Sequence, residues 1–168
     1  MGDAGILRPD ARVELVDGEI IDMAPIGSRH AGAVERIAAM LRRIVGDTLM
    51  VRTQQPVSLD EHSEPQPDIA VVRARADFYA TGHPRPADIL VIVEVSDSSL
   101  RHDEDVKAPL YARHGVRELW VFDLEHHQVT RRTDPQAGAY ARRDVAGPEL
   151  TMVSTALGGA LLDFCGVL

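Results

Sequence analysis

Apolar and polar residues follow one another along the chain in short blocks that predict strands with two helices between them. The first block, RVELVDGEIIDMAP at residues 12–25, places two strand-like stretches on either side of Asp17-Gly18. An Asp-Gly pair favours a tight hairpin turn because both turn positions need positive φ, which these residues tolerate. We therefore predict a β-hairpin near the start of the chain.

Residues 29–45 follow a different period, with apolar side chains at every third or fourth position. This spacing predicts an amphipathic helix whose apolar face covers a sheet. Ser28 is suited to cap the start of the helix and Gly46 to end it.

Further apolar runs predict the strands of the sheet. A second helix, which begins after Ser98 or Ser99 and ends near His114, is expected between two of them. The resulting strand–helix–strand order implies a mixed central β-sheet flanked by helices, a mixed α/β (α+β) fold. The predicted strands are 49–59, 68–72, 88–95, 118–124, 127–132 and 139–145.

The composition is that of a globular protein. With 168 residues, 45% of them hydrophobic, the chain is long enough to bury a core, and we expect one domain over residues 1–168. There is no apolar run of about 18 residues and no signal-peptide pattern, so we expect a cytoplasmic protein without a membrane segment. The net charge of -8 argues against strong general affinity for nucleic acid but permits a locally basic groove.

Glu94 is the first candidate for chemistry, because it interrupts the run DILVIVEVS that otherwise resembles the buried centre of a sheet. A buried carboxylate must be paired, protonated or bound to a metal, since an isolated buried charge costs several kcal/mol. Asp68 begins another apolar strand, and two carboxylates on neighbouring strands suit Mg²⁺. Period-two alternation assigns to one face of the Glu94 strand Leu90, Ile92, Glu94 and Ser96.

Lys107 is the only lysine among the 18 basic residues. It lies about two turns into the second predicted helix, from which its side chain can reach back over the strand end. An ammonium near a metal and a phosphate can orient water and offset transition-state charge. A solvent-exposed helix pair with Asp103 is the alternative. The predicted helix face carries Asp103, Lys107, Tyr111 and His114.

Two residues of the first helix have open interpretations. Glu35 lies beside the apolar stripe, so it is either a solvated charge or a third acid of the metal site. His30, at the start of the helix, is either a surface residue or a partner of the site.

Four stretches together resemble the Uma-type (Uma-two) endonuclease family, within the PD-(D/E)XK restriction-endonuclease-like superfamily. They are VELVDGEI, EPQPDIAVV, VIVEVSDSSL and DVKAPLYARHGVRELWVFD, in the same order, and the resemblance spans residues 12–133. It implies a restriction-endonuclease-like core and a phosphodiesterase site that depends on Mg²⁺ or Mn²⁺.

On that resemblance, Pro67-Asp68 matches the PD element and Glu94 the acidic residue of the second element. The superfamily pattern would place lysine at position 96, where this chain has Ser96. Family members commonly supply the lysine from the following helix, which here is Lys107. Positions where the family tends to carry supporting polar or aromatic residues are occupied by His30, Gln54, Asp103 and Tyr111.

We therefore expect a metal-dependent nuclease that hydrolyses phosphodiester bonds of nucleic acid, with DNA as the expected substrate. Asp68 and Glu94 would bind Mg²⁺ or Mn²⁺, and Lys107 would position water or stabilise charge. Two alternatives stay open: a catalytically weak nucleic-acid-binding module of a mobile-element or defence system, and a structural protein whose two acids are satisfied by backbone donors and arginines. A homodimer is compatible with the resemblance, because dimers are common among double-strand cutters of this superfamily.

Overall fold

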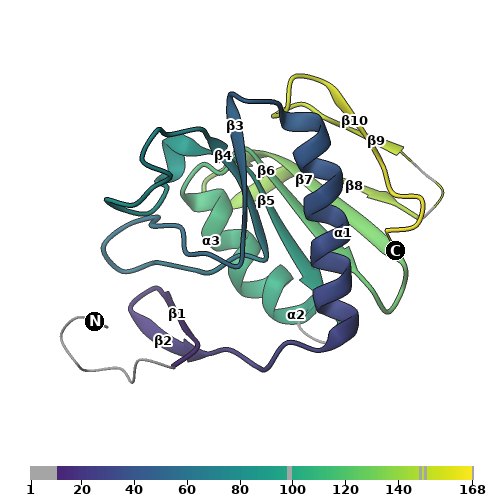
Figure 1. Cartoon of the computed structure of the whole chain (residues 1–168). Helices are drawn as coiled ribbons and strands as arrows, with labels where there is room; N and C mark the ends of the chain where they lie inside the picture. Colours follow the sequence, from purple (N-terminus) through teal and green to yellow (C-terminus); the bar gives the residue numbers. More distant parts are fainter. Residues whose placement is uncertain (1–10, 98–99, 148, 150, 168) are drawn as a thin grey trace.

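The computed structural model describes residues 11–97, 100–147, 149 and 151–167, and its centre is a mixed β-sheet (Figure 1). The six strands follow the order β3-β4-β5-β6-β7-β8. β5 and β6 are parallel, and the other neighbours are antiparallel. The predicted mixed sheet is thereby confirmed. The strands are β3 (Leu49–Thr53), β4 (Ile69–Arg73), β5 (Ile89–Ser96), β6 (Glu118–Asp123), β7 (Gln128–Gln136) and β8 (Ala139–Ala146).

Helices cover both faces of this sheet, as the sequence predicts. α1 (Ser28–Val45) buries its apolar stripe, including Ile37, in one cluster with the β-strands. On the opposite face, Leu110 of α3 (Ala108–Arg113) belongs to a second cluster. No helix in the described part of the chain is long and apolar enough to cross a membrane. The shorter helical segments are η1 (Pro86–Asp88), α2 (Leu100–His102) and the π-helical turn η2 (Asp103–Lys107).

Two hairpins flank the central sheet. β1 (Val13–Val16) and β2 (Glu19–Asp22) pair through a tight turn in which Gly18 has φ 84°, which confirms the predicted N-terminal hairpin. The backbone of Leu15 joins this hairpin to the loop before β4 through both hydrogen bonds with Glu64. β9 (Thr151–Ser154) and β10 (Ala160–Asp163) form the second hairpin, over the same face as α1 (Figure 1).

Three predicted ends of helices or strands need correction or lie outside the described residues. Ser28 is the first residue of α1 and does not cap it; the cap position is Gly27, without a side-chain hydrogen bond. The strand predicted over residues 49–59 ends at Thr53, because Gln54 adopts φ 51°. The alternative caps of the second helix, residues 98 and 99, lie outside the described residues.

Leu90 does not share the face of Glu94. A register shift between β4 and β5 occurs opposite Leu90, and its side chain packs with the α1-side cluster. Such a bulge reverses the alternation of side chains at one point in a strand. From Val91 onward the alternation is regular, and Ile92 lies in the α3-side cluster.

The second helix is interrupted by the π-helical turn η2, which ends two residues before Pro109. Proline has no backbone N–H and its ring clashes with the carbonyl four residues earlier, so a regular α-helix is not favoured at this point. The wider turn accommodates the proline and buries both Asp103 and Lys107. Single π-helical turns inside α-helices occur frequently at functional sites.

Candidate active site

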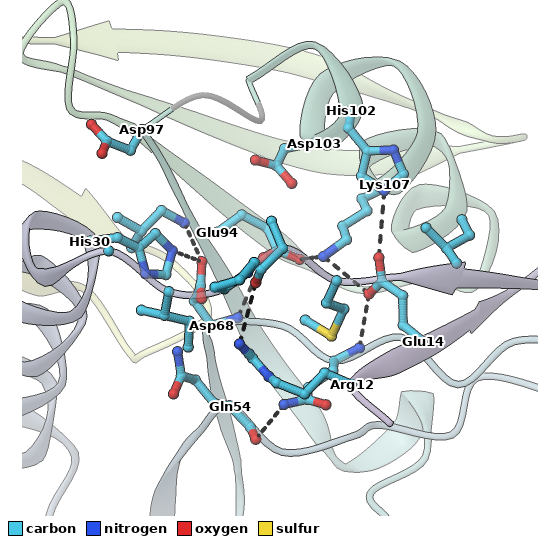
Figure 2. A pocket seen from close by; sticks show the side chains of 18 of the residues that line it. Arg12, Glu14, His30, Gln54, Asp68, Glu94, Asp97, His102, Asp103 and Lys107 are labelled. Atoms are coloured by element: carbon cyan, nitrogen blue, oxygen red, sulfur yellow. Dashed lines mark hydrogen bonds and ion pairs between the residues drawn. The ribbon is translucent and has the colours of Figure 1, made fainter. Parts of the chain in front are cut away.

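A pocket of about 550 Å³ is lined by residues of the β1–β2 hairpin, the start of α1, the end of β5 and the second helix (Figure 2). These segments are far apart in the sequence and meet beside the start of β4. The pocket contains both predicted carboxylates and the predicted lysine. Its polar and charged lining includes Glu14, His30, Asp68, Glu94, Asp103 and Lys107.

Asp68 and Glu94 are joined by reciprocal contacts between β4 and β5. Oδ2 of Asp68 accepts a hydrogen bond from the backbone N–H of Val95 at 2.8 Å. The backbone N–H of Asp68 lies 3.4 Å from Oε2 of Glu94. Because each acid contacts the backbone beside the other, the two carboxylates are adjacent at the same end of the sheet.

His30 fixes the Asp68 carboxylate from the side of α1. Its Nε2 lies 3.1 Å from Oδ2 of Asp68, and both side chains are largely buried. This hydrogen bond is the main cause that raises the pKa of His30 above its ordinary value, although burial opposes it. His30 therefore lies beside the candidate site, the second of the two positions that the sequence left open.

Lys107 lies between two glutamates. Its Nζ is 3.3 Å from Oε1 of Glu94 and 3.2 Å from Oε2 of Glu14 (Figure 2). Burial lowers the pKa of Lys107, but the carboxylates of Glu94, Glu14 and Asp103 more than offset this and raise it above its ordinary value. The side chain is 6% exposed, so the exposed helix pair proposed as an alternative does not describe its surroundings.

Glu94 is one of the most deeply buried charged residues described. Burial raises its pKa to about 8, and the ammonium of Lys107 opposes that shift. The Tyr111 hydroxyl donates a 2.7 Å hydrogen bond to Oε1, the oxygen that Lys107 also contacts. Because burial and Glu94 raise the pKa of Tyr111, the hydroxyl keeps its proton and remains a donor.

The other predicted site residues do not all lie at the pocket. Gln54 lines the pocket, and its backbone N–H donates to the Asp68 carbonyl at 2.9 Å. Asp103 is buried and lines the pocket. Ser96 is buried at the end of β5. Glu35 is exposed on α1 and does not line the pocket, so the structure does not bring it to the other acids.

Glu14 is the site residue that the sequence analysis missed. It is 4% exposed and contacts Lys107 from the N-terminal hairpin. The signal was the alternation in β1, where Glu14 and Val16 are the buried positions of VELV. A glutamate in the buried phase of a strand is as unusual as Glu94 and called for the same question.

The two carboxylates fit a hard divalent cation. Oδ1 of Asp68 accepts no hydrogen bond from any described residue, and Oε2 of Glu94 has only the long 3.4 Å contact with a backbone N–H. Mg²⁺ is usually held by one or two carboxylates and keeps several waters. No set of three or more His, Cys, Asp or Glu side chains among the described residues is arranged to hold a metal. A cation on Asp68 and Glu94 would therefore depend on water for much of its coordination.

The sequence also matches a known protein family. The model of the Uma2 family, described as "Putative restriction endonuclease", matches residues 4–164. The chain belongs to the Uma2 family. This assignment confirms the resemblance drawn from the four sequence stretches and supports a nuclease function.

A solved structure extends the comparison to the fold. The Uma2 chain resembles the crystal structure of a "putative nuclease belonging to DUF820" from Anabaena variabilis, with a TM-score of 0.72 over 99% of this chain and 97% of that one. At 14% identity, the likeness is one of fold. No curated protein matches the chain.

Proposed function

We propose that this Uma2 chain is a metal-dependent nuclease that hydrolyses phosphodiester bonds of DNA, with Mg²⁺ or Mn²⁺ on Asp68 and Glu94. The observation that carries the proposal is the adjacency of these two carboxylates with the Lys107 ammonium, 3.3 Å from Glu94. A bound divalent cation would polarise a phosphoryl oxygen and lower the pKa of a coordinated water.

In this proposal, Asp68 presents one oxygen to the pocket. Its Oδ2 is held by His30 and by the backbone N–H of Val95, which fixes the rotation of the carboxylate. Oδ1 then has a defined direction, and fixed ligands reduce the entropy lost when a cation binds. The proposed contribution of His30 is therefore orientation of Asp68.

Lys107 acts in this proposal as a donor and a positive charge. Its pKa lies above the ordinary value, so the ammonium keeps its protons at neutral pH and cannot serve as a general base. A buried ammonium directed into the pocket can donate to a phosphoryl oxygen and stabilise negative charge that develops during hydrolysis. Tyr111 supports it by holding Oε1 of Glu94.

The test is cleavage of supercoiled plasmid DNA and of a labelled RNA with Mg²⁺, Mn²⁺ or EDTA. We expect metal-dependent nicking of DNA that is lost in both Asp68→Ala and Glu94→Ala. Asp47→Ala, which removes an exposed carboxylate outside the pocket, is the matched control and should cleave like the unaltered protein.

Cleavage that persists in purified Glu94→Ala would remove the assignment of the site. Salt-sensitive DNA binding without nicking at any metal tested would instead favour the nucleic-acid-binding module. Cleavage of RNA alone would keep the site and correct the substrate.

A further inference from the structure

The N-terminal hairpin contributes a buried carboxylate to the candidate site. Glu14 has a side chain that is 3% exposed, and its Oε2 both contacts Lys107 at 3.2 Å and accepts the Gln66 backbone N–H at 3.2 Å. Its other oxygen lies 3.5 Å from Nε2 of His102. A buried glutamate with this set of partners is held in a single direction.

The hairpin that carries Glu14 is itself attached to the loop before β4. Leu15 donates to the Glu64 carbonyl at 3.3 Å and accepts from the Glu64 N–H at 2.8 Å. Gly18 donates to the His62 carbonyl at 2.8 Å. These backbone bonds fix β1 relative to Asp68, which lies four residues beyond Glu64 in the sequence.

Lysine needs such support because its ammonium is a point charge on a flexible stem. Glu94 alone would hold Nζ from one side and leave rotation about several bonds. Glu14 contacts the same nitrogen from a different element, so that the two carboxylates define where the ammonium lies (Figure 2). The hairpin and the sheet together therefore fix Lys107.

We propose that Glu14 is a positioning residue, which holds the Lys107 ammonium in the pocket and makes the N-terminal hairpin a working part of the site. The proposal rests on the nuclease function proposed above, because that function gives Lys107 its role. The contact itself can be tested without any cleavage assay.

The chain offers a direct probe, since Lys107 is its only lysine. In protein labelled with ¹³C- and ¹⁵N-lysine, all lysine side-chain NMR signals come from this residue. We expect the two Hε protons to be inequivalent and the Cε–H bond to be rigid in the unaltered protein at fixed pH. In Glu14→Ala the Hε signals should merge and the mobility should increase, and Glu14→Gln, which keeps the shape without the charge, should be intermediate.

Asp17→Asn is the matched control, because Asp17 lies on the same hairpin, is exposed and pairs with Arg113 instead of Lys107. Asparagine also tolerates the φ of 51° at this position. The lysine signals of this variant should match those of the unaltered protein. Lysine signals in both Glu14 variants that match the unaltered protein would overturn the proposal, whether or not the protein cleaves DNA.

Where cleavage is measurable, Glu14→Gln should lower kcat by about 10- to 100-fold, as for groups that orient a site residue, with KM for DNA little changed. Equal losses in Asp17→Asn and Glu14→Gln would overturn the role, because they would reflect hairpin attachment in general. If the unaltered protein does not cleave, the proposed function fails, while the NMR comparison still decides whether Glu14 fixes Lys107.

Discussion

Two buried glutamates on neighbouring parallel strands have opposite environments. Glu94 lies near the end of β5 and Glu118 at the start of β6, and each is at most 2% exposed. Glu94 belongs to the α3 side of the sheet and borders a pocket. Glu118 lies beneath the C-terminal hairpin, where Ser154 of β9 donates to it.

The partners of Glu118 are neutral donors that enclose both of its oxygens. Trp120 Nε1 donates to Oε1 at 2.9 Å, and the Ala156 backbone N–H donates to Oε2 at 2.9 Å. The hydroxyls of Ser154 and Thr155 add contacts to Oε2 at 3.1 and 3.4 Å. Such a set satisfies a buried carboxylate without a ligand, so Glu118 has the features of a structural link between β6 and the C-terminal hairpin.

Glu94 differs from Glu118 in two ways. One of its partners is positively charged, and one of its oxygens receives only a single long hydrogen-bond contact. Lys107 and Tyr111 share Oε1, while Oε2 has one long backbone contact. A buried carboxylate with unused acceptor capacity beside a pocket is a candidate ligand site, whereas a fully hydrogen-bonded one is not. Burial of a charge alone does not separate the two roles.

The strongest test of the contrast between Glu94 and Glu118 is to neutralise each glutamate in turn. We expect Glu94→Gln to lower the rate of metal-dependent DNA cleavage by about 10³-fold or more, as for groups whose removal disables a catalytic unit. Glu118→Gln should stay within about threefold, because this residue does not line the pocket. Initial cleavage rates, with circular dichroism to verify folding, measure both. A large loss in Glu118→Gln alone would reverse the assignment of roles.

The charge on Lys107 should have the next largest effect. Lys107→Met keeps most of the side-chain length and removes the ammonium, so kcat should fall by about 10²- to 10³-fold. Lys107→Arg should recover little of this loss, because the planar guanidinium cannot replace a point charge between two carboxylates. Steady-state kinetics at saturating DNA provide the measurement. Full activity in Lys107→Met would show that Asp68 and Glu94 act without the lysine.

Local patterns in the sequence were sufficient for much of the fold. The Asp17-Gly18 turn and the apolar stripe of α1 each depend on residues near one another in the chain, and both are present. Glu94 was also recognisable, because a polar residue in an apolar run is a local signal. The bulge opposite Leu90 was not recognisable, since it depends on how β4 pairs with β5.

The partners of Glu14 and most partners of Glu118 depend on tertiary structure. Glu14 approaches Lys107 only because the hairpin attaches to the loop before β4. Glu118 begins the stretch ELWVFD, and one of its donors, Trp120, lies only two residues away. Its other donors come from residues 154–156 in a glycine-interrupted tail. A sequence pattern identifies a buried carboxylate, but its partners decide what the carboxylate does.

Stability should respond mainly to Glu118. Glu118→Ala leaves the Trp120 and Ala156 N–H groups without their acceptor in a buried region, which we expect to lower the free energy of unfolding by about 2–3 kcal/mol. Urea denaturation followed by tryptophan fluorescence reports this directly, since Trp120 is the single tryptophan. Glu94→Gln, which is isosteric with the protonated acid, should change stability by less than about 1 kcal/mol at pH 5, where the raised pKa of Glu94 keeps it protonated in the folded protein. Equal destabilisation by the two variants would contradict the contrast between a structural link and a ligand site.

The last effect concerns the dependence of stability on pH. Because burial raises the pKa of Glu94 from 4.5 to about 8, the folded protein without metal binds one proton more than the unfolded chain between these values. The stability that this proton contributes is complete below pH 4.5 and is lost as pH rises toward 8, with a slope of at most about 1.4 kcal/mol per pH unit. Urea titrations in EDTA from pH 5 to 8 should therefore show a steeper fall for the unaltered protein than for Glu94→Gln. Parallel curves would mean that Lys107 keeps Glu94 ionised, in which case the cation would join a preformed ion pair and would not have to displace a proton.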